Sequence, residues 1–218
     1  MTMLHYAHHV PRDARDGAPL LVLLHGRGSD EQDLMGLVPH LPPGVMVVSP
    51  RAPFSGIPWG YGPGWAWYRF LGRNRPEPAS FEQSQQALGD FLRDLPERLP
   101  VTPGPTVLGG FSQGGTMSLA HALRNPGTVP AVLNFSGFLA DHPTVSATPE
   151  TVKETRIFWG HGTEDPQIPI GLAVEGRAAL RAAGADLEAH DYPMGHSIDP
   201  DELADAVRWA GWEAVAAK

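Results

Sequence analysis

The stretch TVLGGFSQGGTMSLAHAL, residues 106–123, decides the fold of this chain. Its apolar start at residues 106–108 predicts a strand, and residues 113–123 have the composition of a helix. Between them stands Gly-x-Ser-x-Gly, with Ser112 at its centre. A serine in so tight a strand-to-helix turn adopts strained backbone angles, and small residues two positions before and after it prevent side-chain collisions. The stretch therefore predicts a raised serine nucleophile beside the N–H groups of a helix start.

The neighbouring elements weigh against an incidental serine in a glycine-rich turn, which is the alternative in a chain with 25 glycines. Apolar runs bounded by Gly, Pro or Ser predict strands at residues 20–25, 45–49, 106–108, 131–135 and 156–159. Helical spacing predicts helices at residues 80–95, 113–123, 170–183 and 200–217. Residues 3–10 predict an additional antiparallel edge strand. This order predicts an α/β fold with a mostly parallel central sheet and helices on both faces, as one domain of residues 1–218.

Composition excludes several classes of function. The chain has no cysteine, which excludes disulfides, thiolate nucleophiles and cysteine zinc sites. Its net charge of −8 disfavours nucleic acid and anionic membranes as partners. No apolar run approaches the roughly 20 residues that span a bilayer, and the first ten residues lack the pattern of a signal peptide. We therefore expect a soluble cytoplasmic protein without membrane insertion.

A serine nucleophile needs a base within hydrogen-bond distance, and the base needs an orienting carboxylate. The carboxylate is expected in a loop after a late strand, and Asp165 stands six residues beyond Trp159. Glu164 is its nearest rival. Asp141, which follows the strand predicted at residues 131–135, is a weaker one.

The base is expected in the loop between the last strand and the last helix. His196 occupies this loop, just before a helix start at Asp199 and Pro200. The chain has ten histidines, and for any single one a solvent-exposed loop residue is the alternative. His190, expected within the last strand, and His161 are weaker candidates for the base.

Two backbone N–H groups are needed to bind the oxyanion of a tetrahedral intermediate. One belongs to the residue after the nucleophile, Gln113, and the other to the loop after an early strand, where Arg27 stands between two glycines. The alternative, a phosphate-binding glycine loop, lacks both the Gly-x-Gly-x-x-Gly spacing and a P-loop lysine. The loop is therefore interpreted as half of an oxyanion hole.

The Pro- and Gly-rich region of residues 50–79 carries seven aromatic residues, and half of the six tryptophans fall within nine positions. We interpret Trp65, Trp67 and Tyr68 as part of an aromatic wall for an apolar substrate. A loop that packs only on itself is an equally weighted alternative.

The N-terminal histidines do not indicate a metal site. In a strand His5 and His9 share one face while His8 lies on the other, and no acidic or cysteine partner is near. We interpret them as surface residues of an edge strand and expect no metal.

The segments LLHGRGSDEQDL, GGFSQGG, HGTEDPQIP and MGHSID, in this order, resemble those of the phospholipase/carboxylesterase family of small α/β-hydrolases. The resemblance runs over essentially the whole chain and implies the α/β-hydrolase fold. It implies Ser112 as nucleophile, Asp165 as acid and His196 as base, with the N–H groups of Arg27 and Gln113 as oxyanion donors. It also implies hydrolysis of esters, and sometimes of thioesters or lysophospholipids, without a cofactor.

Two departures from the family pattern qualify this resemblance. Its eukaryotic thioesterases carry Trp-Phe-Asp where this chain has Trp67, Tyr68 and Arg69, which is more like the bacterial carboxylesterases. A hydrophobic residue is common in the family where Arg27 stands. We therefore expect a carboxylesterase acting on small esters of short to medium acyl chain. The alternatives are a thioesterase or lysophospholipase of the same family and, more remotely, a non-catalytic binding module; a homodimer is left open.

Overall fold

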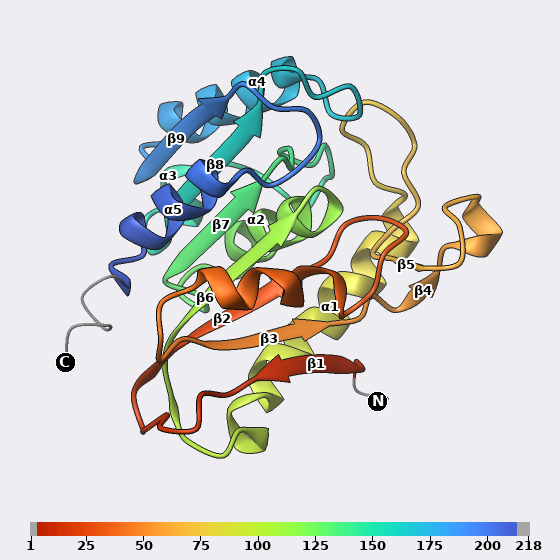
Figure 1. The fold of residues 1–218 in the computed structure, drawn as a ribbon. Helices are drawn as coiled ribbons and strands as arrows, with labels where there is room; N and C mark the ends of the chain where they lie inside the picture. The colour runs from red at the N-terminus through yellow and green to blue at the C-terminus, as the bar shows by residue number, and fades with distance from the viewer. Residues whose placement is uncertain (1–3, 213–218) are drawn as a thin grey trace.

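The computed structural model describes residues 4–212. Across them seven strands form one sheet in the order β1-β3-β2-β6-β7-β8-β9, and neighbours are parallel except for β1 with β3 (Figure 1). The strands are β1 (Tyr6–His9), β2 (Ala18–Leu24), β3 (Met46–Pro50), β6 (Pro103–Phe111), β7 (Ala131–Phe135), β8 (Arg156–Gly162) and β9 (Leu187–Tyr192). The predicted mostly parallel sheet is confirmed, and the antiparallel edge strand is present as β1.

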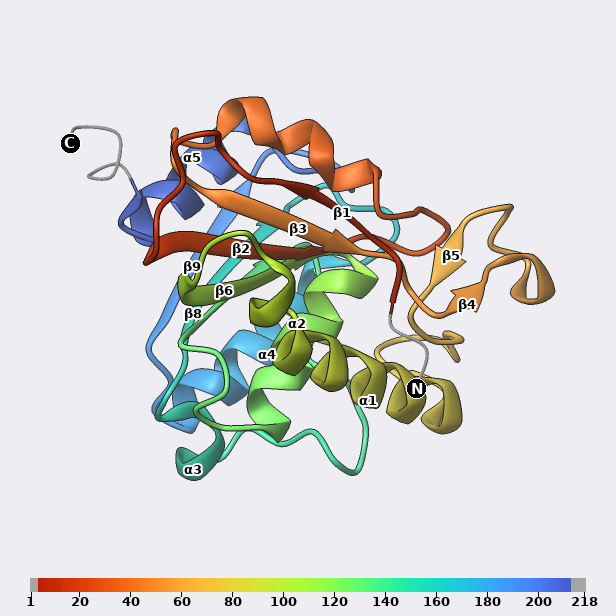
Figure 2. The same cartoon turned by 90° about the horizontal axis from the view of Figure 1, so that it is seen from below.

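Helices cover both faces of this sheet, as predicted (Figure 2). One face carries η1 (Asp33–His40) and α5 (Pro200–Trp209), and the other carries α1 (Pro78–Asp94), α2 (Gln113–Arg124) and α4 (Ile170–Ala182). The remaining short helices are η2 (Ile57–Trp59), η3 (Pro96–Arg98) and α3 (Pro149–Val152). In the described part of the chain, no helix is both long and apolar enough to cross a membrane.

Strand β2 shows why its sequence is continuously apolar. Leu20, Val22 and Leu24 pack in the core layer shared with α1 and α2, while Leu21 and Leu23 pack in the layer shared with η1 and α5. A parallel strand buried on both faces needs apolar side chains at every position. Because parallel strands end at the same edge, the loops after β2, β6, β8 and β9 meet there, where ligands bind in open α/β sheets.

The structure differs from the predicted elements in several places; η1, η3 and α3 were not predicted, and β6 begins at Pro103 rather than at residue 106. Helix α5 ends at Trp209, because Gly211 adopts a left-handed conformation with φ 74° that stops the helix; residues 213–217 of the prediction lie outside the described residues. The irregular region of residues 50–79 contains an antiparallel hairpin of β4 (Phe54–Ser55) and β5 (Trp65–Ala66), which projects from the body of the molecule in Figure 1.

Candidate active site

Ser112 stands in the tight turn between β6 and α2, with φ 56° and ψ −115°. The flanking glycines make this turn possible. A Cβ at Gly110 would lie 2.3 Å from the carbonyl carbon of Gly114, and a Cβ at Gly114 would lie 1.9 Å from the carbonyl oxygen of Leu24. The backbone N–H of Ser112 donates to the carbonyl of Phe135 at 2.8 Å, which ties the turn to β7. These backbone contacts hold Ser112 in its strained conformation.

The three residues predicted for catalysis lie in one hydrogen-bonded line. Ser112 Oγ is 2.9 Å from His196 Nε2, and His196 Nδ1 is 2.6 Å from Asp165 Oδ2. In the neutral imidazole, Nδ1–H donates to the carboxylate and Nε2 accepts from the serine hydroxyl. The ring of Phe111 packs on the imidazole with centroids 4.7 Å apart. This arrangement can remove a proton from Ser112 and hold the resulting imidazolium beside a carboxylate.

Asp165 is oriented by the loop that follows it. Its Oδ1 accepts the backbone N–H groups of Gln167 and Ile168, each at 2.8 Å, which leaves Oδ2 for His196. Glu164 and Asp141 are both exposed, and neither side chain contacts the histidine in the described residues. The structure thus brings Asp165, and not its two rivals, to the predicted base.

The two rival histidines have other partners. His161 is fully buried; its Nε2–H donates to the carbonyl of Ile168 at 2.9 Å, and the same nitrogen is 3.8 Å from Asp165 Oδ2. Burial lowers the pKa of His161, so it stays neutral at pH 7 and supports the Asp165 loop. His190 lies within β9, as predicted, and contacts Glu188 at 2.9 Å.

Two N–H groups in the described part of the chain remain available at the nucleophile. The backbone N–H groups of Arg27 and Gln113 make no hydrogen bond within residues 4–212, and both residues line the cavity at Ser112. The loop of Arg27 is fixed by His25, whose Nδ1–H donates to Gly26 at 2.7 Å while Nε2 accepts from Ala52 N–H at 3.0 Å. Burial lowers the pKa of His25 and keeps this acceptor unprotonated. The N–H groups of Arg27 and Gln113 can therefore act as the two donors of an oxyanion hole.

The cavity at Ser112 has a volume of about 30 Å³, close to the space of a single water in the liquid. Its walls are apolar apart from a few polar groups. The lining residues are Arg27, Tyr68, Phe70, Ser112, Gln113, Phe138, Gln167 and Ile168. The cavity opens to solvent, so this volume describes only the space directly beside Ser112.

The aromatic wall differs from the prediction, because only Tyr68 of the three named residues lines the cavity. Trp67 is fully buried in the core, and its indole N–H donates to the carbonyl of His25 at 3.0 Å. Trp65 packs under the guanidinium of Arg51, 4.9 Å from its ring centroid. The three neighbouring aromatic side chains therefore have three different surroundings. Phe70 belonged to the aromatic run and Gln167 and Ile168 to the segment HGTEDPQIP, but none was predicted to line the cavity, and Phe138 had no sequence signal.

The side chain of Gln113 has a second role that the sequence did not indicate. Its Oε1 accepts the backbone N–H of Trp67 at 2.9 Å, and its Nε2 donates to the carbonyl of Tyr68 at 2.7 Å. The side chain is buried, so both contacts form away from water. Gln113 therefore joins the nucleophile turn to the loop that carries the cavity wall.

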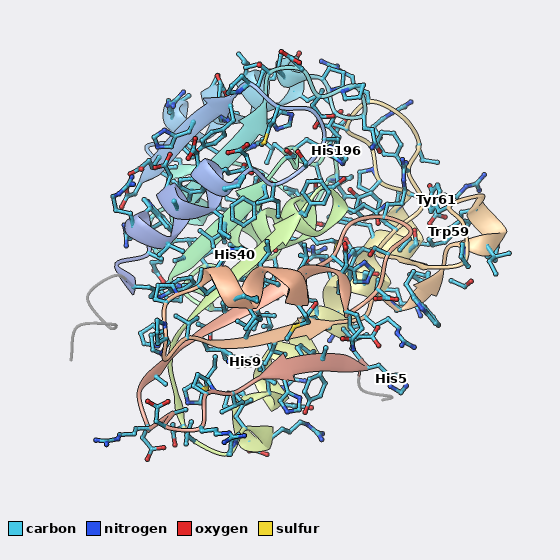
Figure 3. The ribbon with its side chains drawn as sticks, in the orientation of Figure 1. His5, His9, His40, Trp59, Tyr61 and His196 are labelled. Atoms are coloured by element: carbon cyan, nitrogen blue, oxygen red, sulfur yellow. The ribbon has the colours of Figure 1, made fainter. Side chains whose placement is uncertain are left out.

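The histidines divide into distant groups. Figure 3 shows His196 at the edge where the parallel strands end, with Tyr61 on the neighbouring loop, while His9 lies in the outer strand β1 and His5 just before it. No group of three His, Asp or Glu side chains within residues 4–212 is placed to hold a metal ion. The described residues therefore contain no built metal centre.

The known proteins to which this chain is similar are named as carboxylesterases, thioesterases or esterases. The model of the phospholipase/carboxylesterase family matches residues 7–210. A probable carboxylesterase SOBER1-like of Arabidopsis thaliana is 35% identical over 111 residues, covering 50% of this chain and 42% of that protein, so the match spans less than half of that relative. An acyl-protein thioesterase 1 of Cryptococcus neoformans is 26% identical over 226 residues, covering 91% of this chain and 93% of its own length. The crystal structure of esterase PE8 superposes with a TM-score of 0.79 at 30% identity, covering 96% and 98% of the two chains.

Proposed function

The chain belongs to the phospholipase/carboxylesterase family, and from this premise we propose that it is a serine carboxylesterase acting on small esters of short to medium acyl chain. The observation that carries the proposal is the line of hydrogen bonds from Ser112 through His196 to Asp165. A relative named as an esterase, similar over nearly the whole chain, supports the same reaction. We assign the activity to a single domain of residues 1–218.

In the proposed mechanism Ser112 Oγ attacks the ester carbonyl while His196 Nε2 takes its proton. Asp165 holds the imidazole in the required tautomer and stabilises its cation. The N–H groups of Arg27 and Gln113 donate to the oxygen that becomes negative. His196 then gives its proton to the leaving alcohol, and a water activated by the same nitrogen releases the acyl group from Ser112.

Thioester hydrolysis is the second candidate. It is favoured by the similarity over most of the chain to a protein named acyl-protein thioesterase 1. Arg69 at the position of the thioesterase aspartate supports small esters instead. Paired measurements of kcat/KM on an ester and a thioester with the same acyl group separate the two activities.

The proposal is tested with Ser112→Ala. Loss of a nucleophile of this kind costs about 10⁴ to 10⁶ in kcat. We expect such a loss on 4-nitrophenyl esters of increasing chain length, together with loss of labelling by a fluorophosphonate probe. A folded variant that keeps a tenth of the wild-type rate excludes Ser112 as the nucleophile. An unlabelled wild-type protein points to a binding module instead.

A further inference from the structure

The cavity at Ser112 has one charged wall. Among the lining residues that the structure describes, Arg27 alone carries a full charge, and no carboxylate is present. The other walls are aromatic or apolar, apart from Ser112 and two glutamines. The chain has a net charge of −8, yet the positive charge of Arg27 lies beside the nucleophile with no carboxylate among the lining residues to pair with it. A charge placed in this way at a cavity is a candidate for ligand binding.

The guanidinium of Arg27 makes no ion pair and no hydrogen bond within residues 4–212. Its central carbon lies 4.8 Å from the ring centroid of Tyr61 and 5.9 Å from that of Phe70. These two residues are also hydrogen-bonded to each other, because the hydroxyl of Tyr61 accepts the backbone N–H of Phe70 at 2.8 Å. Cation–π contacts of this kind hold the cation in place and leave its N–H groups free to donate.

The backbone around Arg27 is equally fixed. Gly28 N–H donates to the carbonyl of Trp65 at 2.8 Å, and Trp65 N–H donates to the carbonyl of Ser29 at 2.6 Å. The two segments approach so closely that a Cβ at Gly28 would lie 2.5 Å from the carbonyl oxygen of Tyr61. Arg27 is therefore placed before a ligand arrives, so little freedom is lost when one binds.

Two other arginines of the same region, Arg51 and Arg73, are paired with carboxylates. Arg51 bonds Glu31 through two contacts of 2.5 Å, and Arg73 bonds Glu175 at 2.7 and 3.0 Å. Arg27 differs from these two, because its side-chain partners within residues 4–212 are the rings of Tyr61 and Phe70. This contrast separates a cation used for structure from one that is available to a ligand.

We propose that Arg27 forms a carboxylate-binding subsite, and that the preferred substrates are half-esters of short dicarboxylic acids. The inference rests on the proposed esterase function. Arg27 and Ser112 line the same cavity, so the guanidinium is within reach of a ligand group a few bonds from the ester carbonyl. The free carboxylate of a half-ester, a few bonds from the ester carbonyl, meets the guanidinium there as a bidentate pair. A short chain between the two groups keeps the carboxylate within the reach of one arginine side chain.

The test compares two esters of nearly the same shape, monoethyl succinate and ethyl levulinate, in which a methyl group replaces one carboxylate oxygen. Ethanol release is followed by NMR for the wild type, Arg27→Met, Arg27→Lys and the control Arg73→Met. We expect the wild type to prefer the half-ester in kcat/KM by about 10- to 100-fold. Arg27→Met should lower this ratio to near one, and Arg27→Lys should keep part of it.

The control variant and added salt test whether the preference for the half-ester comes from the charge of Arg27. Arg73→Met removes an exposed arginine that is paired with Glu175, and should leave the ratio unchanged. Added salt should weaken the preference, because the subsite opens to solvent. A wild-type ratio near one, or a ratio that survives in Arg27→Met, overturns the proposal.

A binding measurement separates this inference from the proposed function. In the Ser112→Ala protein, saturation-transfer NMR should detect monoethyl succinate, and the additional change Arg27→Met should abolish the signal. If the wild type cleaves neither ester but this Arg27-dependent binding remains, the esterase function fails and the subsite stands. If the binding does not depend on Arg27, the subsite is excluded.

Discussion

The two sides of the cavity are built in different ways. On one side Ser112, Asp165 and His196 each follow the end of a parallel strand, and the turn at Ser112 is packed so tightly that a Cβ at Gly114 would lie 1.9 Å from a backbone oxygen. On the other side, residues 50–79 carry Tyr68 and Phe70, and side chains from elsewhere hold them in addition to the backbone bonds of Trp65. Gln113 bonds the backbone of Trp67 and Tyr68, and Ser84 bonds the carbonyl of Trp67.

This difference separates chemistry from selectivity. Backbone contacts that leave no room for a Cβ cannot be replaced by another side chain, so the geometry of the reacting groups is fixed by the fold. Side-chain hydrogen bonds and ring contacts can be exchanged one at a time, so the wall can change while the sheet stays intact. We therefore expect changes on the strand side to cost the reaction or the fold, and changes on the loop side to cost less.

After Ser112 itself, the largest effect is expected at Asp165. Asp165→Asn keeps the shape but favours the wrong tautomer of His196, and should lower kcat by about 10³ to 10⁴. Glu164→Gln, next to it and exposed, is the matched control and should lose less than about tenfold. Steady-state kinetics on a small ester measure both, and the reverse ranking would transfer the role to Glu164.

A pair of glycines tests the comparison directly. Gly114→Ala puts a methyl group into the backbone of Leu24 and should destabilise the fold by about 4 kcal/mol or more. Gly72→Ala, in the wall region, meets no atom within 4 Å and carries only the strain of φ 97°, which costs about 1–2 kcal/mol. Urea unfolding measures both. Equal losses would show that the two sides are equally constrained.

Gln113 connects the two sides of the cavity through its hydrogen bonds to Trp67 and Tyr68. Gln113→Ala keeps the backbone N–H but leaves the N–H of Trp67 and the carbonyl of Tyr68 without their partners, which should cost about 3 kcal/mol. Protease cleavage within residues 54–76 should rise as the wall loosens. The exposed Gln86 is the control, and Gln86→Ala should change stability by less than about 0.5 kcal/mol. A wall that stays protected in Gln113→Ala would contradict this assignment.

The strand side was predictable because its signals are local. The pattern around Ser112 combines a strand, a turn and a helix in one segment, and the periodicity of the parallel strands is visible without knowledge of their partners. The positions of Asp165 and His196 followed from the order of elements, and the structure places both side chains in line with Ser112. Their catalytic roles stay predictions.

The loop side was not predictable at the same level. Which aromatic residues face the cavity depends on the hairpin of β4 and β5 and on contacts with residues far along the chain, such as the 46 positions between Trp67 and Gln113. Phe138 and Ile168 reach the cavity only through the fold. Composition left an aromatic wall and a self-packed loop equally weighted, and packing decides which side chains line the cavity.

The smallest effect on stability is expected from a fall in pH, and it acts through α2, the helix that directly follows Ser112. Burial lowers the pKa of His121 on α2 from 6.5 to about 4. The unfolded chain therefore binds a proton near pH 6.5 that the folded protein accepts only near pH 4. The stability from neutral His121 is complete above pH 6.5 and is lost as the pH falls towards 4.

Between pH 7 and pH 5 this loss amounts to about 2 kcal/mol. His121→Gln removes the titrating group, so its free energy of unfolding should fall by about 2 kcal/mol less than that of the wild type over the same interval. His25 and His161 also have pKa values lowered by burial, but both stay in the variant, and the difference therefore isolates His121. Urea unfolding at the two pH values measures it. Equal losses in both proteins would mean that His121 is protonated alike in the folded and unfolded states, and that acid does not act through the helix of the nucleophile.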